Sequence, residues 1–482
     1  MSSVRDRIPL FAAWSALVLA MHAWTGLGAS GPAVRPIGWQ DIAPVQQRLE
    51  SHGITAAAFP SYVERVRQTN ARRVREGDLD HLIFYLLQST HFTKLPPIEP
   101  ALSAKTLVES RAADAPSPVK ARAGALLRAL DSSDRDARVT YFRELVNAAF
   151  PVRREREAAL LREYLRVMRF LYEKEFVAQR SAERTAAVAD LYRTRGLSTD
   201  TAVEAGFLVH QGLGVMRAVE PGLQIRRVLI VGPGLDLAPR TSLREAGPPQ
   251  SYQPWAVMDA LLALGLSRAG DVVVVAADIN PRVVQHLRRA RDRPPVLTLA
   301  SEIRENDDVS LSREYREYFE RLGSAIGSPS ANEPLLKTVR VTQVVSSAVQ
   351  AETLDIVTER LTGAPFDLIV ATNILPYFDE PQLALAMVNI AGMLAPGGTF
   401  LHNEGRPSMG DLTTALGLPL EQSRHAVIAK VRGAPPLGDS IWLHRKIRGP
   451  GGQGARGPGG QGVRGPGGQG VRGSGGRGVA GR

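Results

Sequence analysis

The chain has 482 residues, which is long for a single compact domain, and its 44% hydrophobic and 22% charged residues are typical of a globular protein. Cysteine is absent, which excludes disulfides, thiolate nucleophiles, iron–sulfur clusters and cysteine-ligated zinc. The formal charge of +11 is unevenly distributed, because residues 445–482 hold seven Arg and one Lys and no acid. The rest of the chain carries only +3, so the basic character belongs to the tail.

The first 30 residues have the pattern of a signal peptide or membrane anchor. Arg5 and Arg7 precede an almost unbroken apolar run over residues 10–21, and small residues follow from Gly26. This run is short against the about 20 residues that a membrane-spanning helix needs. We expect export or anchoring, with membrane contact through this segment; a cytoplasmic location is the alternative.

Residues 31–197 are predicted to form an α-helical N-terminal domain. Apolar side chains recur every three or four positions over residues 154–180, and strand signals are scarce. Residues 91–100 are proline-rich and cannot be helical throughout. His81 and His91 lack neighbours in a metal-binding pattern, so they are interpreted as packing or surface residues.

From residue 198 to 445, strands and helices alternate. Thr201 followed by Glu204 is a capping-box pattern that predicts a helix start. The apolar runs after it predict parallel strands covered by helices on both faces. The expected strands are 227–231, 271–277, 339–345, 367–372 and 399–401, and the expected helices are 255–264, 281–291 and 381–395. The predicted fold class is a doubly wound, mostly parallel α/β sheet, with its ligand beyond the carboxyl ends of the strands.

Three of these strands end in residues suited to a ligand. Gly232, Gly234 and Asp236 follow the first strand in the sequence GPGLD, where glycines allow a ligand to approach the backbone closely. Asp278 follows the second strand, where a carboxylate can accept hydrogen bonds from both ribose hydroxyls. Asn373 follows the fourth strand, where its amide can reach a ligand. A plain turn is the structural alternative for both the glycines and Asn373.

Other candidates have weaker support. Residues 349–352 follow the expected third strand, where an adenine amino group would be met, and Tyr377 is placed to wall a pocket. His402 and Glu404 lie two apart, on one face of the fifth strand, and packing is favoured over catalysis. The sequence has no phosphate-binding P-loop, no nucleophile elbow and no histidine pair spaced for a metal. No catalytic residue and no metal ligand is assigned.

The order of these motifs resembles the class I S-adenosylmethionine-dependent methyltransferases over residues 205–445, half of the chain. The resemblance rests on VLIVGPGLD, VVVVAADINP, FDLIVATNILPYFD and MLAPGGTFLHNE. It implies a Rossmann-like methyltransferase domain that binds S-adenosylmethionine and transfers its methyl group to an acceptor, small or macromolecular, that the sequence does not identify.

The resemblance also implies roles for single residues. By this likeness, Gly232, Gly234 and Asp236 hold the methionine end of the cofactor. Asp278 binds the ribose, and Asn373 borders the methyl group.

Two features depart from the family pattern. The glycine turn and the second-strand acid are far apart in sequence, so residues 239–253 are expected to form a loop. The charged insert 293–337 is interpreted as a lid or substrate element. A nicotinamide-dependent oxidoreductase is the nearest alternative enzyme, but the sixth position of its glycine pattern requires a small residue and here is Leu237.

A repeated glycine-rich unit, GPGGQGAR and its variants, fills residues 449–482. Seventeen of these 34 residues are glycine, so a disordered Gly/Arg-rich tail from residue 446 is expected, with weak polyanion contact as one function. An exported protein would be separated from a cofactor made in the cytosol. A non-catalytic exported or envelope protein that retains the sheet is therefore the alternative from another class.

Overall fold

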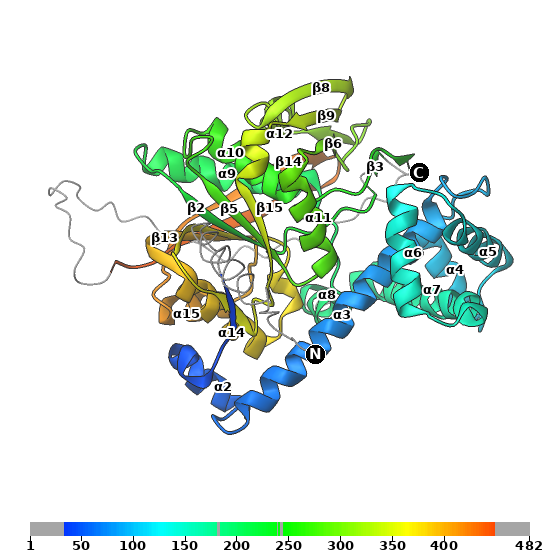
Figure 1. The fold of residues 1–482 in the computed structure, drawn as a ribbon, viewed down its shortest axis with the longest axis horizontal. Coiled ribbons are helices and arrows are strands. Elements are labelled where there is room, and N and C mark those ends of the chain that lie inside the picture. The colour runs from blue at the N-terminus through cyan, green and yellow to red at the C-terminus, as the bar shows by residue number, and fades with distance from the viewer. Residues whose placement is uncertain (1–32, 181–183, 239, 242–243, 449–482) are drawn as a thin grey trace, which may run out of the picture.

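The computed structural model describes residues 33–180, 184–238, 240–241 and 244–448. The expected export segment and most of the Gly/Arg-rich tail lie outside these residues. None of the helices that are described combines the length and apolar character needed to span a membrane. Figure 1 shows a twisted sheet between layers of helices, with a helical bundle beside it.

The central sheet has the strand order β10-β5-β2-β12-β13-β15-β14-β7 in the described part of the chain. The first five strands are mutually parallel, and the last three pair antiparallel. Their bounds are β2 Arg227–Val231, β5 Val273–Asp278, β7 Val309–Leu311, β10 Val349–Thr353, β12 Phe366–Ala371, β13 Leu394–His402, β14 Leu420–Val431 and β15 Ala434–Arg445. Strands β5 and β12 flank β2 on opposite sides, so the strand order reverses there and ligand sites are favoured at this point.

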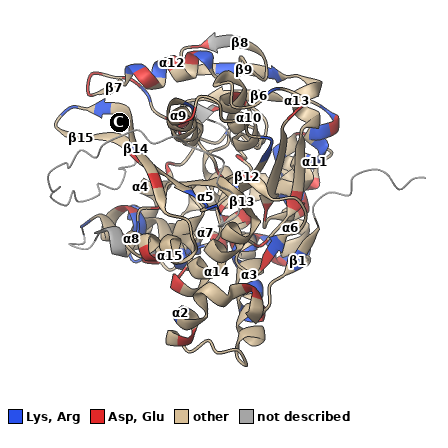
Figure 2. Cartoon of the chain, turned by 90° about the vertical axis from the view of Figure 1, so that its left-hand side faces the viewer, with Lys and Arg blue, Asp and Glu red and all other residues tan. Residues whose placement is uncertain are grey.

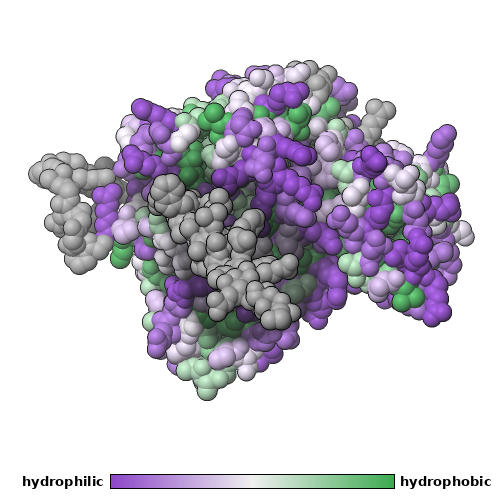
Figure 3. All heavy atoms as spheres, in the orientation of Figure 1, coloured by the Kyte–Doolittle hydropathy of each residue, from purple (hydrophilic) through white to green (hydrophobic). Residues whose placement is uncertain are grey.

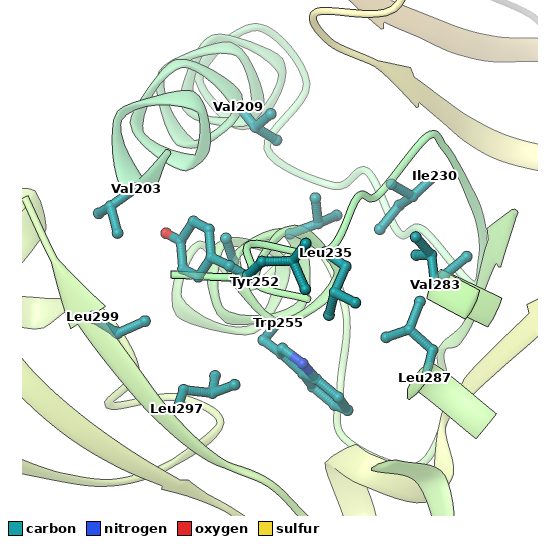
Figure 4. Close-up of a cluster of buried hydrophobic side chains, with 14 of the residues drawn as sticks. Val203, Val209, Ile230, Leu235, Tyr252, Trp255, Val283, Leu287, Leu297 and Leu299 are labelled. Atoms are coloured by element: carbon teal, nitrogen blue, oxygen red, sulfur yellow. The ribbon is translucent and has the colours of Figure 1, made fainter. Parts of the chain in front are cut away.

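Alternate residues of the central strands enter two hydrophobic clusters, because side chains alternate between the faces of a strand. Val228 and Ile230 pack in one cluster, with α9 (Val203–Val219), α10 (Gln253–Ala263) and α11 (Pro281–Asp292). Figure 4 shows part of this cluster, including Trp255. Leu229 and Val231 pack in the other, with α14 (Glu380–Met393) and α15 (Ser408–Ala415). The expected doubly wound sheet is present.

Helices dominate residues 33–197. The short strand β1 (Val34–Pro36) pairs with β11 (Glu359–Leu361). The remaining elements are η1 Trp39–Val45, α2 Gln46–Ser51, α3 Phe59–Gln88, α4 Pro100–Glu109, α5 Ser117–Asp131, α6 Ala137–Ala149, η2 Arg153–Glu155, α7 Arg156–Tyr172, η3 Glu173–Val177, η4 Ala178–Arg180 and α8 Arg184–Thr194. Figure 3 shows a largely hydrophilic surface over the bundle formed by α4 to α7 and the end of α3.

The long helix α3 is shared by both clusters. Phe59, Val63 and Val66 in its first half pack with sheet residues beside α14. Leu82 and Leu86 in its second half lie in the cluster that includes the bundle. Both clusters therefore contain residues from either side of position 197, and the domain boundary expected there stays a prediction.

The expected third parallel strand is wrong. Residues 339–345 overlap β9 (Leu336–Val341), which pairs antiparallel with β6 (Val296–Ala300) and β8 (Gly327–Glu333) in a separate sheet. The third parallel strand is instead β10, so residues 349–352 are the strand itself and not the loop after it. Residues 339–345 hold four valines, whereas β10 has the sequence VQAET with one, so hydrophobic content favoured the wrong segment.

The long segments between strands hold further structure. Within the expected loop 239–253, two strands of two residues each, β3 (Arg240–Thr241) and β4 (Arg244–Glu245), pair antiparallel. The charged insert contains β6, β7, β8, the start of β9 and α12 (Arg313–Arg321), which carries charges of both signs in Figure 2. Helix α13 (Gln343–Ser347) follows β9 in the chain.

The capping box expected at Thr201 and Glu204 is also wrong. Helix α9 begins at Val203 after Ala202, which has no capping side chain. Thr201 instead donates its hydroxyl to the Pro233 carbonyl, and the buried Glu204 accepts a hydrogen bond from the Tyr315 hydroxyl at 2.6 Å. Tertiary partners thus take both side chains away from the helix end.

Candidate functional site

A cavity lies at the carboxyl ends of β10, β5, β2 and β12, and we call it the rim cavity. Helix α3 and the segment 197–201 complete its wall. The lining residues are Asn70, Val74, 197–201, Val231, Gly232, Gly234, 277–280, 354–356, 372–374, Tyr377 and Phe378. Gly232, Gly234, Asp278 and Asn373 from the sequence analysis meet here, as does Tyr377. No residue of the insert 293–337 is among them.

The turn after β2 requires glycine at positions 232 and 234, because of its backbone angles and its close contacts. Gly232 and Gly234 have φ of +67° and +72°, in the left-handed region that other residues rarely adopt. A Cβ on Gly234 would lie 2.1 Å from the Thr199 carbonyl oxygen. A Cβ on Gly232 would lie 2.5 Å from the Ile374 side chain. The turn is therefore in close contact with two neighbouring segments.

Residues 197–201 form a strap over the glycine turn. The amide of Leu235 donates to the Thr199 carbonyl at 2.9 Å, and the Thr199 hydroxyl donates back to the Leu235 carbonyl at 2.9 Å. The Thr201 hydroxyl reaches the Pro233 carbonyl at 3.2 Å. The sequence analysis missed this role because Thr201 matches a helix-start pattern.

His81 of α3 holds the strap from the other side. It is buried, and its Nε2 accepts a hydrogen bond from the Thr199 amide at 3.2 Å. Its Nδ1 lies 3.3 Å from a carboxylate oxygen of Asp200. A backbone amide can only donate, so Nε2 is the acceptor in the bond from Thr199. His81 is a packing residue, as expected, and it also positions the cavity wall.

Asp278 points toward the glycine turn. Its Oδ2 accepts a hydrogen bond from the Gly234 amide at 3.2 Å, and its Oδ1 accepts one from the Asn280 amide at 2.7 Å. The side chain is only 5% exposed. Burial raises the pKa of Asp278 to about 6, against the opposing effect of the two amide bonds. A buried carboxylate at a cavity wall can accept hydrogen bonds from ligand hydroxyls.

Asp355, which the sequence analysis missed, gives the cavity a second buried carboxylate. It follows the end of β10 and accepts hydrogen bonds from Asn70 Nδ2 and the Val357 amide, both at 3.0 Å. Burial raises its pKa. An acid just after a parallel strand was the available signal, but it was hidden because that strand was assigned to residues 339–345.

Thr372 and Asn373 lie at the β12 end of the cavity. Thr372 is buried, and its hydroxyl oxygen accepts a hydrogen bond from Gln253 Nε2 at 2.6 Å. Asn373 has φ of +61° and exchanges two hydrogen bonds with Asn403. Asn403 in turn donates to Asp439 at 2.9 Å. The side chains that hold Thr372 and Asn373 come from distant parts of the sequence.

Asp236 does not join the other predicted site residues. Its backbone pairs with Gln250, and its Oδ1 accepts from the Ala238 amide at 3.1 Å. It lines a different pocket on the far side of the strap, together with His81 and Asp200. Because the backbone of Asp236 pairs with Gln250, this last residue of GPGLD leaves the glycine turn and does not line the rim cavity with Gly234.

His402 is buried in the sheet and packs against aromatic rings. It stacks on Phe400 and His444 with ring centroids 4.8 and 5.0 Å away, and its Nδ1 accepts from the Glu404 amide. Burial lowers its pKa well below the usual range, so the ring is neutral. Among the described residues, no group of three His, Asp or Glu side chains is placed to hold a metal ion.

The charges in the rim cavity are of one sign. Asp200, Asp278 and Asp355 line it, and no Lys or Arg is among the lining residues. Such a wall suits hydroxyl groups and positive charge, since carboxylates accept hydrogen bonds and attract cations. It is poorly suited to the pyrophosphate of a nicotinamide dinucleotide.

No protein-family model and no curated protein matches the chain. Solved structures that it resembles include the N-methyltransferase NodS from Bradyrhizobium japonicum WM9, with 16% identity over 50% of this chain and 97% of that chain and a TM-score of 0.27. Magnesium protoporphyrin IX methyltransferase from Synechocystis PCC 6803 has 8% identity over 55% and 99%, with a TM-score of 0.28. A TehB-like SAM-dependent methyltransferase from Corynebacterium glutamicum has 14% over 56% and 98%, with a TM-score of 0.25.

Proposed function

We propose that the chain is an S-adenosylmethionine-dependent methyltransferase whose cofactor occupies the rim cavity. The observation that carries the proposal is the position of Asp278, buried at the cavity wall and bonded to the amide of Gly234. A carboxylate at this place, beside a glycine turn and in a wall without cations, fits a ribose attached to a positively charged sulfonium.

Residues at different strand ends would contact different parts of the cofactor. Asp278 accepts the ribose hydroxyls, and Asp355 at the neighbouring strand end is placed for the adenine amino group. Gly232 and Gly234 stand beside Asp278 in the cavity wall, and Asn373 borders the end that reacts.

The cofactor, when bound, would supply a methyl group on a sulfonium: the acceptor's lone pair would form the new bond to the methyl carbon, and the electron pair of the methyl–sulfur bond would stay on sulfur, which leaves as the neutral thioether of S-adenosylhomocysteine. The residues of this chain would bind the cofactor, align it with the methyl acceptor and shield both from water. Ile374, Tyr377 and Phe378 bring apolar surface to the cavity, and the strap covers the glycine turn. Alignment and exclusion of water account for much of the rate of such transfers, so a strong base is not required.

Isothermal titration of the full-length protein with S-adenosylhomocysteine tests the proposal. We expect micromolar or tighter binding, with NAD⁺ as the comparison ligand at the same concentrations. Binding of NAD⁺ in preference to S-adenosylhomocysteine would favour the oxidoreductase alternative, and absence of any heat at high micromolar S-adenosylhomocysteine would remove the proposal.

A further inference from the structure

Four buried polar residues of α3 are hydrogen-bonded to segments that line the rim cavity. Their partners follow β10, β12 and β5 or belong to the strap, so one helix contacts the cavity wall at several places. The pairs are Asn70 with Asp355, Arg73 with the Tyr377 carbonyl, Asp78 with Asn280, and His81 with the Thr199 amide. The pair of Asp78 and Asn280 bears most directly on the ribose acid, because Asn280 is also bonded to Asp278.

The orientation of Asn280 is fixed by its partners. Its backbone N–H donates to Asp278 Oδ1 at 2.7 Å, a shorter bond than the one from Gly234. Its side-chain Oδ1 faces the backbone N–H of Arg282 at 3.0 Å, and this group can only donate. The Nδ2 of Asn280 therefore faces Asp78 Oδ1, at 2.9 Å. Asp78 thus holds the residue whose amide holds Asp278.

Asp78 is itself a buried carboxylate with partners from two further helices. It is 3% exposed, and its Oδ1 also accepts a hydrogen bond from the Tyr141 hydroxyl of α6 at 2.9 Å. Its Oδ2 lies 3.6 Å from Arg282 Nε of α11. Turning Asp78 away from Asn280 would leave buried polar groups unpaired, which is unfavourable. The position of Asn280 is therefore set from α3 and α6 as well as from its own helix.

Asp78 also places a second negative charge near Asp278. Burial is the main cause of the raised pKa of Asp278, and the charge of Asp78 raises it further. Burial raises the pKa of Asp78 too, against the bonds from Tyr141 and Asn280. The other titratable or charged groups around the two acids are His81 on α3, Tyr141 on α6, Arg282 on α11, and Asp200, Asp355 and Tyr377 in the cavity wall. Removing the charge at position 78 should therefore change the pH at which Asp278 ionises, even where the bond to Asn280 is kept.

We propose that Asp78 is a positioning residue of the cofactor site, which acts through Asn280 to hold the carboxylate of Asp278 for the ribose. The inference rests on the proposed function, because that function gives Asp278 its ligand. Asp78 lines a neighbouring groove and is not among the residues that line the rim cavity, whereas Asn280 lines both. Its effect on a ligand therefore has to pass through Asn280, and helix α3 becomes part of the machinery that binds the cofactor.

The test measures the affinity of the full-length protein for S-adenosylhomocysteine by titration calorimetry between about pH 5 and 8. Asp78→Asn keeps an oxygen for Asn280 to bond but removes the charge, whereas Asp78→Ala removes both. Asp80→Asn is the matched control, because Asp80 is equally buried on α3 but is paired with Arg166. The melting temperature of each variant shows whether it is folded.

In wild-type protein the affinity should fall below about pH 6, where Asp278 is protonated. In Asp78→Asn we expect this fall at a pH lower by about 0.5–1 unit, because no like charge opposes the ionisation of Asp278. Its affinity at about pH 8 should stay within about twofold of wild type, since the bond to Asn280 is kept. In Asp78→Ala, Asn280 loses its anchor, and the affinity at about pH 8 should fall about tenfold.

Asp80→Asn should keep the wild-type pH dependence even where it lowers the melting temperature, because a loss of stability alone does not move the ionisation of Asp278. A wild-type pH dependence in Asp78→Asn, or an equal shift in Asp80→Asn, would overturn the positioning role. Wild-type affinity at about pH 8 in a folded Asp78→Ala would overturn it as well, and if that variant does not fold, Asp78→Asn decides. Wild-type protein that binds no S-adenosylhomocysteine at any pH would instead refute the proposed function, and the positioning role with it, before any variant is compared.

Discussion

Asp278 Oδ2 lies 3.2 Å from the backbone nitrogen of Gly234 and accepts its hydrogen bond. This bond joins the ends of two adjacent parallel strands, β5 and β2. The acid and the glycine turn are therefore held together in the cavity wall.

Replacing Asp278 should weaken cofactor binding directly. We expect Asp278→Ala to lower the affinity for S-adenosylhomocysteine at least about tenfold, because hydrogen bonds to a charged group contribute about 1.5–3 kcal/mol. Titration calorimetry measures this. Asp271→Ala is the matched control, since Asp271 is exposed just before the same strand. Equal affinities of wild type and Asp278→Ala would clear Asp278 of a ribose-binding role.

The same carboxylate should make binding dependent on pH. Burial raises the pKa of Asp278 to about 6, so the side chain is ionised above this pH and protonated below it. Only the ionised form accepts hydrogen bonds from two hydroxyls, and binding below pH 6 must release a proton. Affinity for S-adenosylhomocysteine should be constant above about pH 7 and fall by up to tenfold per unit below pH 6. Asp278→Asn should remove the fall in affinity near pH 6 and leave only what the second buried carboxylate, Asp355, contributes; a wild-type profile that rises toward acid would contradict the assignment.

The glycine turn should not tolerate a side chain at position 234. A Cβ there meets the Thr199 carbonyl and the Thr201 hydroxyl, and φ is +72°. We expect Gly234→Ala to lower the free energy of unfolding by at least about 2 kcal/mol and to weaken S-adenosylhomocysteine binding, because the strap must move. Gly214→Ala is the control. Gly214 lies in α9 with open space around it, so alanine there should be neutral or stabilise by about 0.5–1 kcal/mol. Similar melts for the two variants would refute the close contact.

Arg122 should be essential for the stability of the bundle. Its buried guanidinium donates to the backbone carbonyls of Leu86, Ser89, Leu95 and Pro96, and so connects α5 to the end of α3 and the loop after it. Arg122→Ala leaves these carbonyls without that donor and should cost at least about 3 kcal/mol in urea unfolding. Arg128→Ala, at an exposed position of the same helix, should stay within about 0.5 kcal/mol of wild type. A small effect of Arg122→Ala would show that the loop carbonyls find other donors.

The sequence predicted the site residues that stand at the ends of strands better than it predicted the residues that hydrogen-bond to them. Gly232, Asp278 and Asn373 stand at the ends of unbroken apolar runs, and parallel strands bring such ends to one edge. Asn403 and Asp439 were not predicted, because the hydrogen bonds from Asn403 to Asn373 and to Asp439 join segments that only the tertiary structure brings together. Asp355 was missed because the strand before it was assigned to the wrong apolar run.

Helix α3 is one continuous rod of 30 residues, about 45 Å long, anchored at each end in a different hydrophobic cluster. Between those anchors it presents Asn70 and Val74 to the rim cavity. A tilt of α3 would move Asn70 and Val74 and so change the width of the cavity, even if the tilt began at residues of α3 that do not line it. We therefore expect that a bundle substitution that shifts α3 would alter ligand affinity without changing any residue that lines the cavity.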